Sequence, residues 1–291
     1  MKKFLLTIAC LAMCCALFSQ HDIMFSQQFF SRINKNPAGT GNYEGIDLFL
    51  VGRLQFVGMD NSPRTLLLNG TGYSEKYKSS VGLSILSDKV SIAKRNDNFK
   101  LVYAYHIDLS DNYLLSLGVS GGVNNFSFNP SKHTIRDEGE TSETYPQEKV
   151  SELDADFDFG AELASEHLLF GASVKHILEN EQTTFSNMRH FYLYGRGYFP
   201  VAENLDLAPA LIFMCADDVA ELDINAMLFY KRMLWGGLTY RPDMKDGFKG
   251  TAVAGQIGIE YKNMRVGYCL EIGGRTSSTS HELILSVGLG K

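Results

Sequence analysis

Cysteine is scarce in this chain of 291 residues, and most of it lies at the N-terminus. Of five cysteines, three (Cys10, Cys14 and Cys15) fall within the first 19 residues. The other two, Cys215 and Cys269, are too few for a disulfide framework or a cysteine-based metal site. One bridge between them stays open as an alternative to the simpler interpretation, two small apolar residues in strands.

Long apolar runs and excess positive charge are also missing. After residue 20, no apolar stretch approaches the ~20 residues that a membrane-spanning helix needs. The formal net charge is −6, which argues against nucleic acid as a partner. The sequence has no phosphate-binding loop and no dinucleotide fingerprint, and its seven histidines lack the spacing of metal ligands. We therefore expect no cofactor, no metal and no enzyme activity.

The chain begins with the features of a secretory signal peptide. Lys2 and Lys3 precede an apolar stretch over residues 4–18, and Ser19 is a small residue suited to the cleavage position. We expect residues 1–19 to be the signal peptide. A retained anchor and lipidation at Cys14 are the alternatives. The stretch is short for an anchor, and Met13 is a poor neighbour for a lipidated cysteine.

Alternation of apolar and polar residues dominates the rest of the sequence. In residues 153–163, one face reads Leu, Ala, Phe, Phe, Ala, Leu, and the other reads Asp, Asp, Asp, Gly, Glu. Successive side chains of a β-strand point to opposite faces, so this segment has an apolar face and an acidic face. In an exported chain, such an apolar face contacts either a protein core or a lipid bilayer.

About fourteen segments are long enough to cross a bilayer as tilted strands, which takes ~9–11 residues each. An even number is typical of bacterial single-chain barrels, and open sheet edges cannot persist in lipid. The sequence thus predicts an all-β, transmembrane antiparallel up-and-down β-barrel of about 14 strands over residues 44–291. The expected strands are 45–57, 62–73, 79–88, 96–109, 112–128, 153–165, 167–178, 188–200, 203–215, 218–230, 232–242, 249–262, 263–273 and 280–290.

The segments outside the strands support a membrane barrel more than a sandwich. Connections of alternating length are expected, with the long ones at 89–95, 129–152, 179–187, 243–248 and 274–279. Residues 20–43 form a polar N-terminal segment that lies on the periplasmic side or in the lumen. We assign the apolar face of residues 153–163 to lipid and its acidic face to the barrel interior.

Aromatic residues gather toward the ends of the predicted strands. Membrane barrels carry aromatic girdles at both interfaces, so this placement is expected, although aromatics are enriched in all strands. The residues concerned are Tyr73, Tyr113, Phe126, Phe128, Tyr198, Phe199, Phe229, Tyr230, Tyr240 and Tyr261.

Two short motifs resemble sites but fit strands better. Residues 118–122 match the G-x-S-x-G pattern of hydrolases, with Ser120 as nucleophile and His106 or His176 as base. That motif needs a strand-to-helix turn, whereas this one lies inside a predicted strand. The alternating aspartates of residues 154–158 resemble a calcium loop, but they lack its turn glycine and its bidentate glutamate.

Several short motifs occur at intervals along the mature chain. They are Phe-Ser-Gln at 25–27, Asn-Pro-Ala-Gly at 36–39, Arg-x-Gln at 53–55 and the terminal Ser-His-Glu at 280–282. Together they resemble the PorP/SprF family of Bacteroidetes outer-membrane proteins. The residues that carry the resemblance are Phe25, Ser26, Gln27, Asn36, Pro37, Ala38, Gly39, Arg53, Gln55, Gly58, Pro63, Thr65, Tyr240, Arg241, Ser280, His281 and Glu282. Phe56 departs from the tryptophan usual in the family.

The resemblance implies a component or accessory of the type IX secretion system in the cell outer membrane. Its partners would be outer-membrane lipid, other secretion components and a secreted surface protein or adhesin, in some members with a link to gliding motility. No catalytic residue carries over. We expect Asn36, Pro37 and Gly39 to set a turn, and Arg53 and Gln55 to project into the lumen, where they would hold the N-terminal segment.

A second hypothesis is an outer-membrane channel for hydrophobic or small solutes, similar to fatty-acid transporters. A polar N-terminal segment before about fourteen strands suits that interpretation equally well. A barrel hydrolase that uses Ser120 is a third, weaker alternative. Alternation alone cannot separate these functions.

Overall fold

The computed structural model describes residues 22–41, 45–58, 61–130, 148–178, 188–216, 219–242, 251–273 and 278–290. The predicted signal peptide, residues 1–19, and most of the connection 129–152 lie outside the described residues. In the described part, no helix has both the length and the apolar character required to cross a membrane.

Strands account for most of the described chain, and two single-turn 3₁₀ helices, η1 (Pro37–Gly39) and η2 (Glu75–Tyr77), accompany them. The strands are β1 (Gly45–Gln55), β2 (Arg64–Ser74), β3 (Ser79–Lys89), β4 (Lys94–Ser110), β5 (Tyr113–Phe128), β6 (Val150–Ala164), β7 (Leu168–Lys175), β8 (His190–Gly197), β9 (Phe199–Ala202), β10 (Leu205–Ala216), β11 (Val219–Tyr230), β12 (Leu234–Arg241), β13 (Ala252–Tyr261), β14 (Met264–Gly273) and β15 (Ser278–Leu289).

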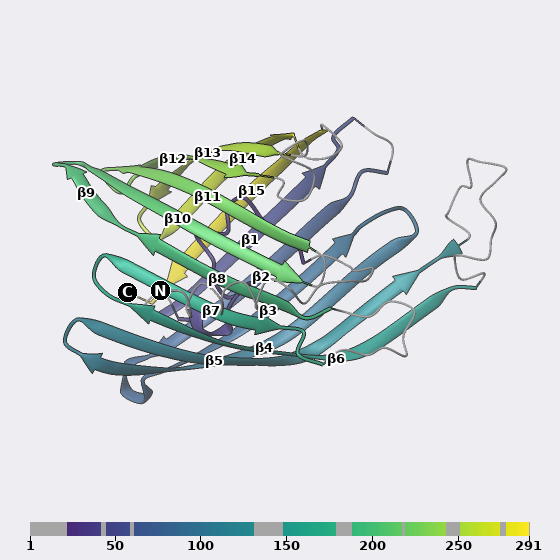
Figure 1. Cartoon of the computed structure of the whole chain (residues 1–291), viewed down its shortest axis with the longest axis horizontal. Helices are drawn as coiled ribbons and strands as arrows, with labels where there is room; N and C mark the ends of the chain where they lie inside the picture. The colour runs from purple at the N-terminus through teal and green to yellow at the C-terminus, as the bar shows by residue number, and fades with distance from the viewer. Residues whose placement is uncertain are drawn as a thin grey trace, which may run out of the picture.

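The strands form one closed antiparallel ring (Figure 1). Strand β1 pairs with both β2 and β15, and β10 pairs with β11, so the ladder has no open edge. Strand β9 continues β8 beyond Tyr198 and shares its partner β10, so the ring itself has fourteen strands. The predicted barrel of about 14 strands is confirmed.

The two faces of the wall follow the predicted alternation. On β6, the apolar residues Leu153, Phe157 and Phe159 are 67 %, 45 % and 47 % exposed on the outside. The intervening Asp156 and Asp158 are only 1 % and 6 % exposed, because they point into the barrel. Period-two geometry therefore places an apolar belt against lipid and the charges inside.

The girdle prediction is wrong for the aromatic residues that point into the barrel. Tyr73 is one of them, since its ring lies 5.4 Å from that of the buried His106. Phe126, Phe128 and Phe229 are 1 %, 1 % and 8 % exposed, and they point into the barrel. Phe126 and Phe128 have the same strand parity as Asn124, which also faces inward. These residues do lie near strand ends, but the face of the sheet on which a side chain lies depends on whether its position along the strand is odd or even. Tyr113, Tyr230, Tyr240 and Tyr261 do lie on the outside.

The two ends of the barrel differ in their connections. At one end, β4 and β5 are joined by residues 111–112, and β6 and β7 by residues 165–167. We call this the short-turn end; it lies on the left in Figure 1. The opposite end carries the connections 56–63, 90–93 and 176–189, and we call it the loop end.

The outer face generates a stability prediction. Ile257 lies mid-strand on β13 and is 66 % exposed. Replacement by arginine places a charge at the centre of the lipid belt, so we expect Ile257→Arg to cost ~2–4 kcal/mol of unfolding free energy. Leu153→Arg, near the loop end, is the control, with an expected cost of ~0–1 kcal/mol. Urea unfolding in phospholipid vesicles measures both, and equal costs would contradict the assigned membrane depth.

Candidate functional site: a luminal segment held by charged clusters

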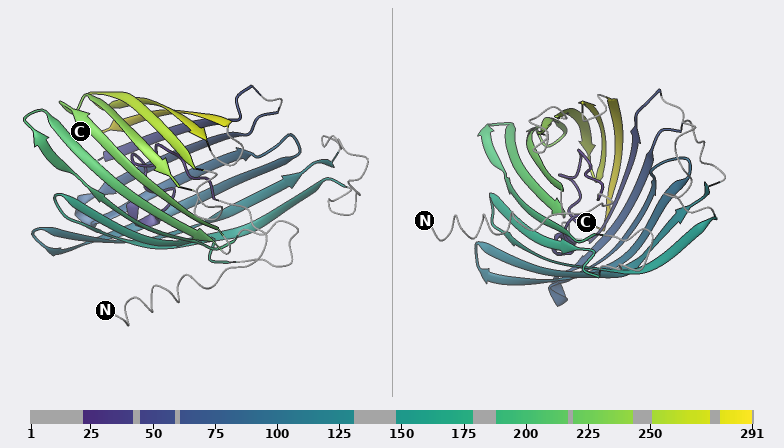
Figure 2. Two further views of the ribbon diagram at one scale, coloured as in Figure 1. Left: turned by 45° about the horizontal axis from the view of Figure 1, so that its top comes forward. Right: turned by 45° about the vertical axis from the view of Figure 1, so that its right-hand side comes forward.

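The N-terminal residues 22–41, here called the luminal segment, run inside the barrel (Figure 2). Gln27 and Asn36 are fully buried, and Lys35 is 4 % exposed. The segment has little regular structure, so few of its backbone groups bond to one another. Buried N–H and C=O groups need partners, and the wall must therefore supply them.

Arg53 on β1 is the central contact at the beginning of the segment. Its Nη1 donates to the Met24 carbonyl at 2.6 Å and to Glu282 Oε1 at 3.1 Å. Its Nη2 donates to Glu271 Oε1 at 2.9 Å. One guanidinium thus joins two wall carboxylates to the backbone of the luminal segment, which is the fork geometry that arginine favours.

Glu282 on β15 completes this attachment from the other side. Its two carboxylate oxygens accept the backbone N–H groups of Ser26 (2.9 Å) and Gln27 (3.1 Å). The Ser26 hydroxyl donates to Glu271 at 2.8 Å. The structure therefore brings Ser26 and Gln27 of the first motif together with Arg53 and Glu282, although 256 positions separate Ser26 from Glu282.

Arg241 on β12 extends the same cluster. It donates to both carboxylate oxygens of Asp223 on β11, at 2.5 and 3.0 Å, and to Glu271 at 2.9 Å. The Gln28 side chain donates to Asp223 at 3.0 Å. We call Arg53, Glu271, Glu282, Arg241 and Asp223 the Arg53 cluster, in which two guanidinium groups bind three carboxylates.

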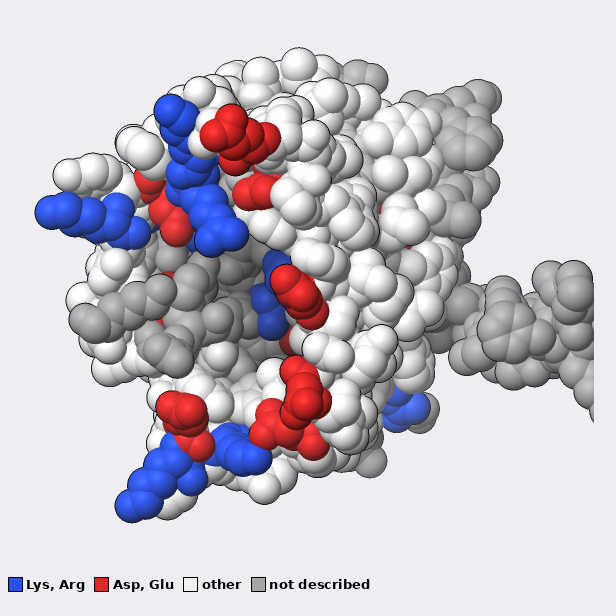
Figure 3. Space-filling model, turned by 90° about the vertical axis from the view of Figure 1, so that its left-hand side faces the viewer, with Lys and Arg blue, Asp and Glu red and all other residues white. Residues whose placement is uncertain are grey.

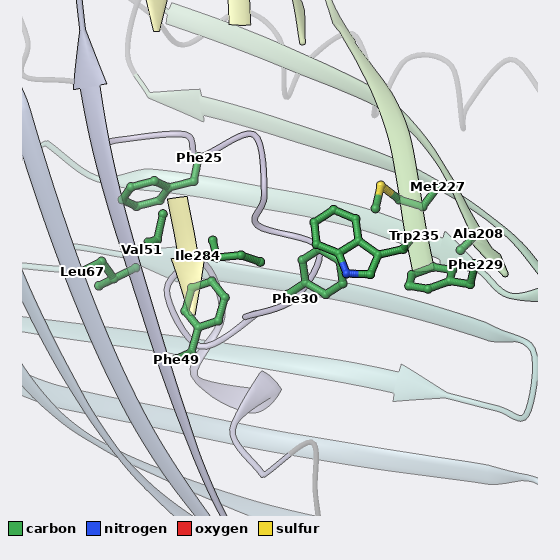
Figure 4. Packing of buried hydrophobic residues seen from close by; sticks show 10 residues of the cluster. All are labelled: Phe25, Phe30, Phe49, Val51, Leu67, Ala208, Met227, Phe229, Trp235 and Ile284. Carbon is green, nitrogen blue, oxygen red and sulfur yellow. The ribbon is translucent and has the colours of Figure 1, made fainter. Parts of the chain in front are cut away.

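An apolar cluster also holds the luminal segment (Figure 4). Phe25 and Phe30 of the luminal segment pack among inward side chains of β1, β2, β10, β11, β12 and β15. The ring of Phe30 lies 4.5 Å from that of Trp235, centroid to centroid. Phe25, the first residue of the first motif, therefore acts as an apolar anchor within the lumen.

The Asn36–Gly39 motif forms a turn against β5 and β6. Asn36 caps η1 by accepting the Ala38 N–H at 2.8 Å, and its Nδ2 donates to the carbonyls of Ala161 (3.0 Å) and Ala172 (3.2 Å). Gly118 lies directly under Pro37 and Ala38, where a Cβ atom would collide with backbone. The wall therefore needs glycine at this position for the turn to approach.

Arg32 and Lys35 carry the positive charge of the segment's second half. Arg32 makes a bidentate pair with Glu162 on β6, at 2.8 and 3.0 Å, and Tyr194 also bonds to Glu162. Lys35 donates to the Gln28 carbonyl at 2.9 Å. Burial, reinforced by the charge of Arg32, lowers the pKa of Lys35 to about 7.

Asp22, the first described residue, is held by a third group of charges. Its carboxylate contacts Lys175 and the Tyr192 hydroxyl, and its N–H donates to His190 Nε2 at 3.0 Å. Burial alone would raise the pKa of Asp22, but Lys175 and His176 outweigh it and hold that pKa well below its usual range. The luminal segment is therefore tied to the wall at its first described residue as well as at Arg32 and Asn36.

The acidic residues of β6 already have a cation among them. Asp156, Asp158 and His176 could together offer ligands to a metal ion. Lys100 Nζ, however, lies 2.7 Å from both oxygens of Asp158 and 2.9 Å from Asp156. The ammonium therefore lies at the position between the two carboxylates that a metal ion would need.

The serine of the G-x-S-x-G motif contacts a carboxylate in the lumen. The Ser120 hydroxyl donates to Asp158 at 2.6 Å. His106 instead contacts Ser80 and Ser116, at 2.6 and 2.7 Å. Neither this geometry nor the continuous strand β5 presents Ser120 as a nucleophile.

The short-turn end is hollowed. Figure 3 shows this end with charged side chains of both signs around the depression. The hollow measures about 420 Å³, and its lining includes Arg32, His106, Glu162 and Tyr198. Part of the luminal segment thus forms the floor of a cavity open to one side of the membrane.

The remaining motif residues lie apart from this site. Gln55, Gly58 and Pro63 belong to the loop-end half of the β1–β2 hairpin, where Pro63 accepts the Gln55 N–H at 3.1 Å. Tyr240 is exposed on the outer surface. The further placements are Thr65, bonded to Asp88 at 2.7 Å, Ser280, buried opposite Gln55, and His281, bonded to Tyr268 at 2.6 Å. The two cysteines, Cys215 and Cys269, are free thiols.

Sequence reasoning missed several partners in the site, including Asp22, Arg32, Lys35, Lys175 and Asp223. A usable signal existed for the first three, because a polar segment that carries charges must find opposite charges once it is buried. The partners themselves lie on strands more than one hundred positions away, as Arg32 and Glu162 show.

Comparison with known proteins gives one family. A family model described as type IX secretion system membrane protein PorP/SprF matches residues 17–287. No curated protein matches the sequence.

Among solved structures, the chain is similar to outer-membrane barrels at low sequence identity. The toluene transporter TbuX of Ralstonia pickettii aligns with TM-score 0.55 and 9 % identity, over 95 % of this chain and 97 % of that one. A deletion mutant of the monoaromatic hydrocarbon channel TodX aligns with TM-score 0.56 and 11 % identity, over 95 % of this chain and 97 % of that one. Omp33 of Acinetobacter baumannii aligns with TM-score 0.51 and 10 % identity, over 84 % of this chain and 98 % of that one. At these identities, the likeness shows the fold alone.

The Arg53 cluster generates the second prediction. Arg53→Met removes a positive charge that both Glu271 and Glu282 contact, and it leaves these two carboxylates buried. We therefore expect a loss of ~3–5 kcal/mol in unfolding free energy. Arg53→Met combined with Glu282→Gln should recover part of that loss. Arg95→Met, which breaks an exposed pair with Asp97, is the control and should cost ~0–1 kcal/mol. Denaturant unfolding in vesicles measures all three, and a small effect of Arg53→Met would refute the central role of this residue.

The pKa of Lys35 generates the third prediction. Its value of about 7 in the fold lies below its ordinary 10.5, so between these pH values the unfolded chain binds more protons. Stability should therefore rise with pH from about 7 to 10.5 and gain nothing from this group below 7. Lys35→Met should flatten that part of the profile, whereas Lys76→Met, on an exposed turn, should not. Urea midpoints across pH 6–10 are the measurement, and identical profiles for wild type and Lys35→Met would contradict it.

Proposed function

The chain belongs to the PorP/SprF family of type IX secretion system membrane proteins, and from this premise we propose that it is a non-enzymatic accessory of that system in the cell outer membrane. It assists the secretion or surface attachment of a partner protein such as an adhesin. Its partners are membrane lipid and other secretion components.

One observation carries this proposal beyond the family: the protein fills its own lumen. The luminal segment is tied to the wall at Asp22, at the Arg53 cluster, at Arg32 and at Asn36. A client protein that crossed this barrel would have to displace every one of these contacts. The geometry therefore supports an accessory that binds at the membrane faces more than it supports a conduit.

The two ends of the barrel suit different partners. Short turns face the periplasm and long loops face outward in bacterial barrels. In that orientation the 420 Å³ hollow opens toward periplasmic components of the secretion machine. The loop end then meets the exported client at the cell surface.

A channel for small or hydrophobic solutes is the second candidate, favoured by the resemblance of the fold to the two hydrocarbon transport barrels. The polar lumen weakens it for hydrophobic solutes, because inward positions carry Arg53, Lys100, Asp158 and Glu162. Uptake of a radiolabelled fatty acid or aromatic hydrocarbon into proteoliposomes tests this candidate directly.

A covalent lock tests the accessory proposal and is the fourth prediction. Ser31 of the luminal segment accepts a hydrogen bond from Asn69 on β2 at 2.9 Å. Ser31→Cys with Asn69→Cys, in a background where Cys215 and Cys269 are serine, should crosslink the segment to the wall on oxidation. We expect secretion of the client to continue in the locked protein, at the level of the reduced protein and of each single variant.

Secretion of the client is measured in a strain whose chromosomal gene for this protein is deleted and which expresses the variant instead. If deletion leaves type IX secretion intact, the accessory role is wrong. If secretion requires the protein but stops on oxidation of the double variant alone, the lumen is the passage and the accessory proposal fails.

A further inference from the structure

A depression lies on the lipid-facing surface at the short-turn end, where β1 to β4 meet. It measures about 700 Å³, within the ~300–1,000 Å³ of small-ligand sites. Its floor is Gly72 on β2, flanked by its cross-strand partners Ile46 on β1 and Val81 on β3. Because Leu66 and Leu68 of the same strand point outward, Gly72 leaves a gap in the apolar belt where a side chain would otherwise stand.

Exposed tyrosines form one wall of this groove. Tyr103 and Tyr105 on β4 are 46 % and 44 % exposed, and Tyr77 of η2 is 65 % exposed. Large aromatic surfaces with a hydroxyl at the tip are suited to the boundary between acyl chains and headgroups. The groove is thus bordered by side chains typical of a membrane interface.

Polarity changes along the groove. Toward the membrane centre its lining is apolar, with Ile46 and Val81. At the turn it becomes polar, where the Ser79 hydroxyl bonds to that of Tyr103 at 2.9 Å and Ser74 ends β2. An amphiphile with its head at the turn and its tail toward the midplane matches this gradient.

Positive charge lies at the polar end. Lys76 of η2 places its Nζ 5.3 Å from the centre of the Tyr77 ring, next to the groove. The neighbouring Lys78 is engaged with Asp108 at 2.6 Å, whereas Lys76 has no carboxylate partner among the described residues. A basic side chain near a membrane surface attracts anionic lipid headgroups.

We propose that this groove is a binding site for a phospholipid of the leaflet at the short-turn end. One acyl chain lies over Gly72 between Ile46 and Val81, and the phosphate lies near Lys76. Lipid is the occupant because the groove is part of the belt that the fold exposes to lipid and because its charge and polarity follow those of a phospholipid. The site is independent of the secretion role, so either proposal can fail alone.

Native mass spectrometry of protein released from nanodiscs tests the site, with palmitoyl-oleoyl phosphatidylglycerol as the probe. A side chain fits at position 72, since a Cβ atom there would have no neighbour closer than 3.9 Å. Gly72→Trp should fill the groove and reduce lipid retention by at least about tenfold. Lys76→Gln should weaken binding of this anionic lipid by about fivefold.

Gly255→Trp is the matched control. Gly255 also faces outward, on β13, and a Cβ atom there would have no neighbour closer than 4.0 Å, but Gly255 does not line the groove. Heat-modifiable migration on gels establishes that each variant is folded. Equal retention by wild type and Gly72→Trp overturns the proposal, as does equal loss in both tryptophan variants. Unchanged lipid retention with loss of a co-purifying secretion component in Gly72→Trp would make the groove a protein interface and also overturn it.

Discussion

Closure of the strand ladder is the constraint on which the rest of this structure depends. In a bilayer, every backbone N–H and C=O must find a partner within the protein, and pairing of β1 with β15 removes the last open edge. Closure then fixes an inside and an outside for each strand. Since side chains alternate, an apolar exterior leaves the polar residues of every strand to face one another in the lumen.

The contents of the lumen follow from that confinement. Asp223, Glu271 and Glu282 are brought together from three strands, and without cations their mutual repulsion and desolvation would be prohibitive. Arg53 and Arg241 supply the countercharge, and the backbone of the luminal segment supplies further donors. Buried ion pairs contribute little net stability compared with apolar packing, so their effect here is to fix where the segment lies. Phe25 and Phe30 add the apolar contacts that such pairs do not provide.

The sequence predicted the wall well and the lumen only in part, for a physical reason. Alternation is local, so residues 153–163 alone identify their lipid face, and repeated alternation identifies the barrel. The prediction for Phe126 and Phe229 failed because nearness to a strand end says nothing about parity. The pairing of Arg32 with Glu162 could not be read from the sequence, since closure of the ring brings together residues 130 positions apart. Glycine also has a different structural effect on each face of the wall. At Gly118, on the inner face, it lets a turn approach closely, whereas at Gly72, on the outer face, it leaves an open groove.

The energetics of the luminal segment bear on how such a barrel could take part in secretion. Two buried ion pairs join the segment to the wall, Asp22 with Lys175 and Arg32 with Glu162, and leaving one partner of such a pair buried and unpaired costs ~3–5 kcal/mol. The bonds of the segment's backbone to Arg53 and Glu282 add to this, so release without replacement of these contacts requires on the order of 10 kcal/mol. A partner could open the lumen only if it bound the open state that much more tightly, a difference of roughly 10⁷ in affinity. A partner that binds at either end of the barrel needs no such difference. The strength of these contacts therefore favours a barrel whose faces work while its lumen stays filled.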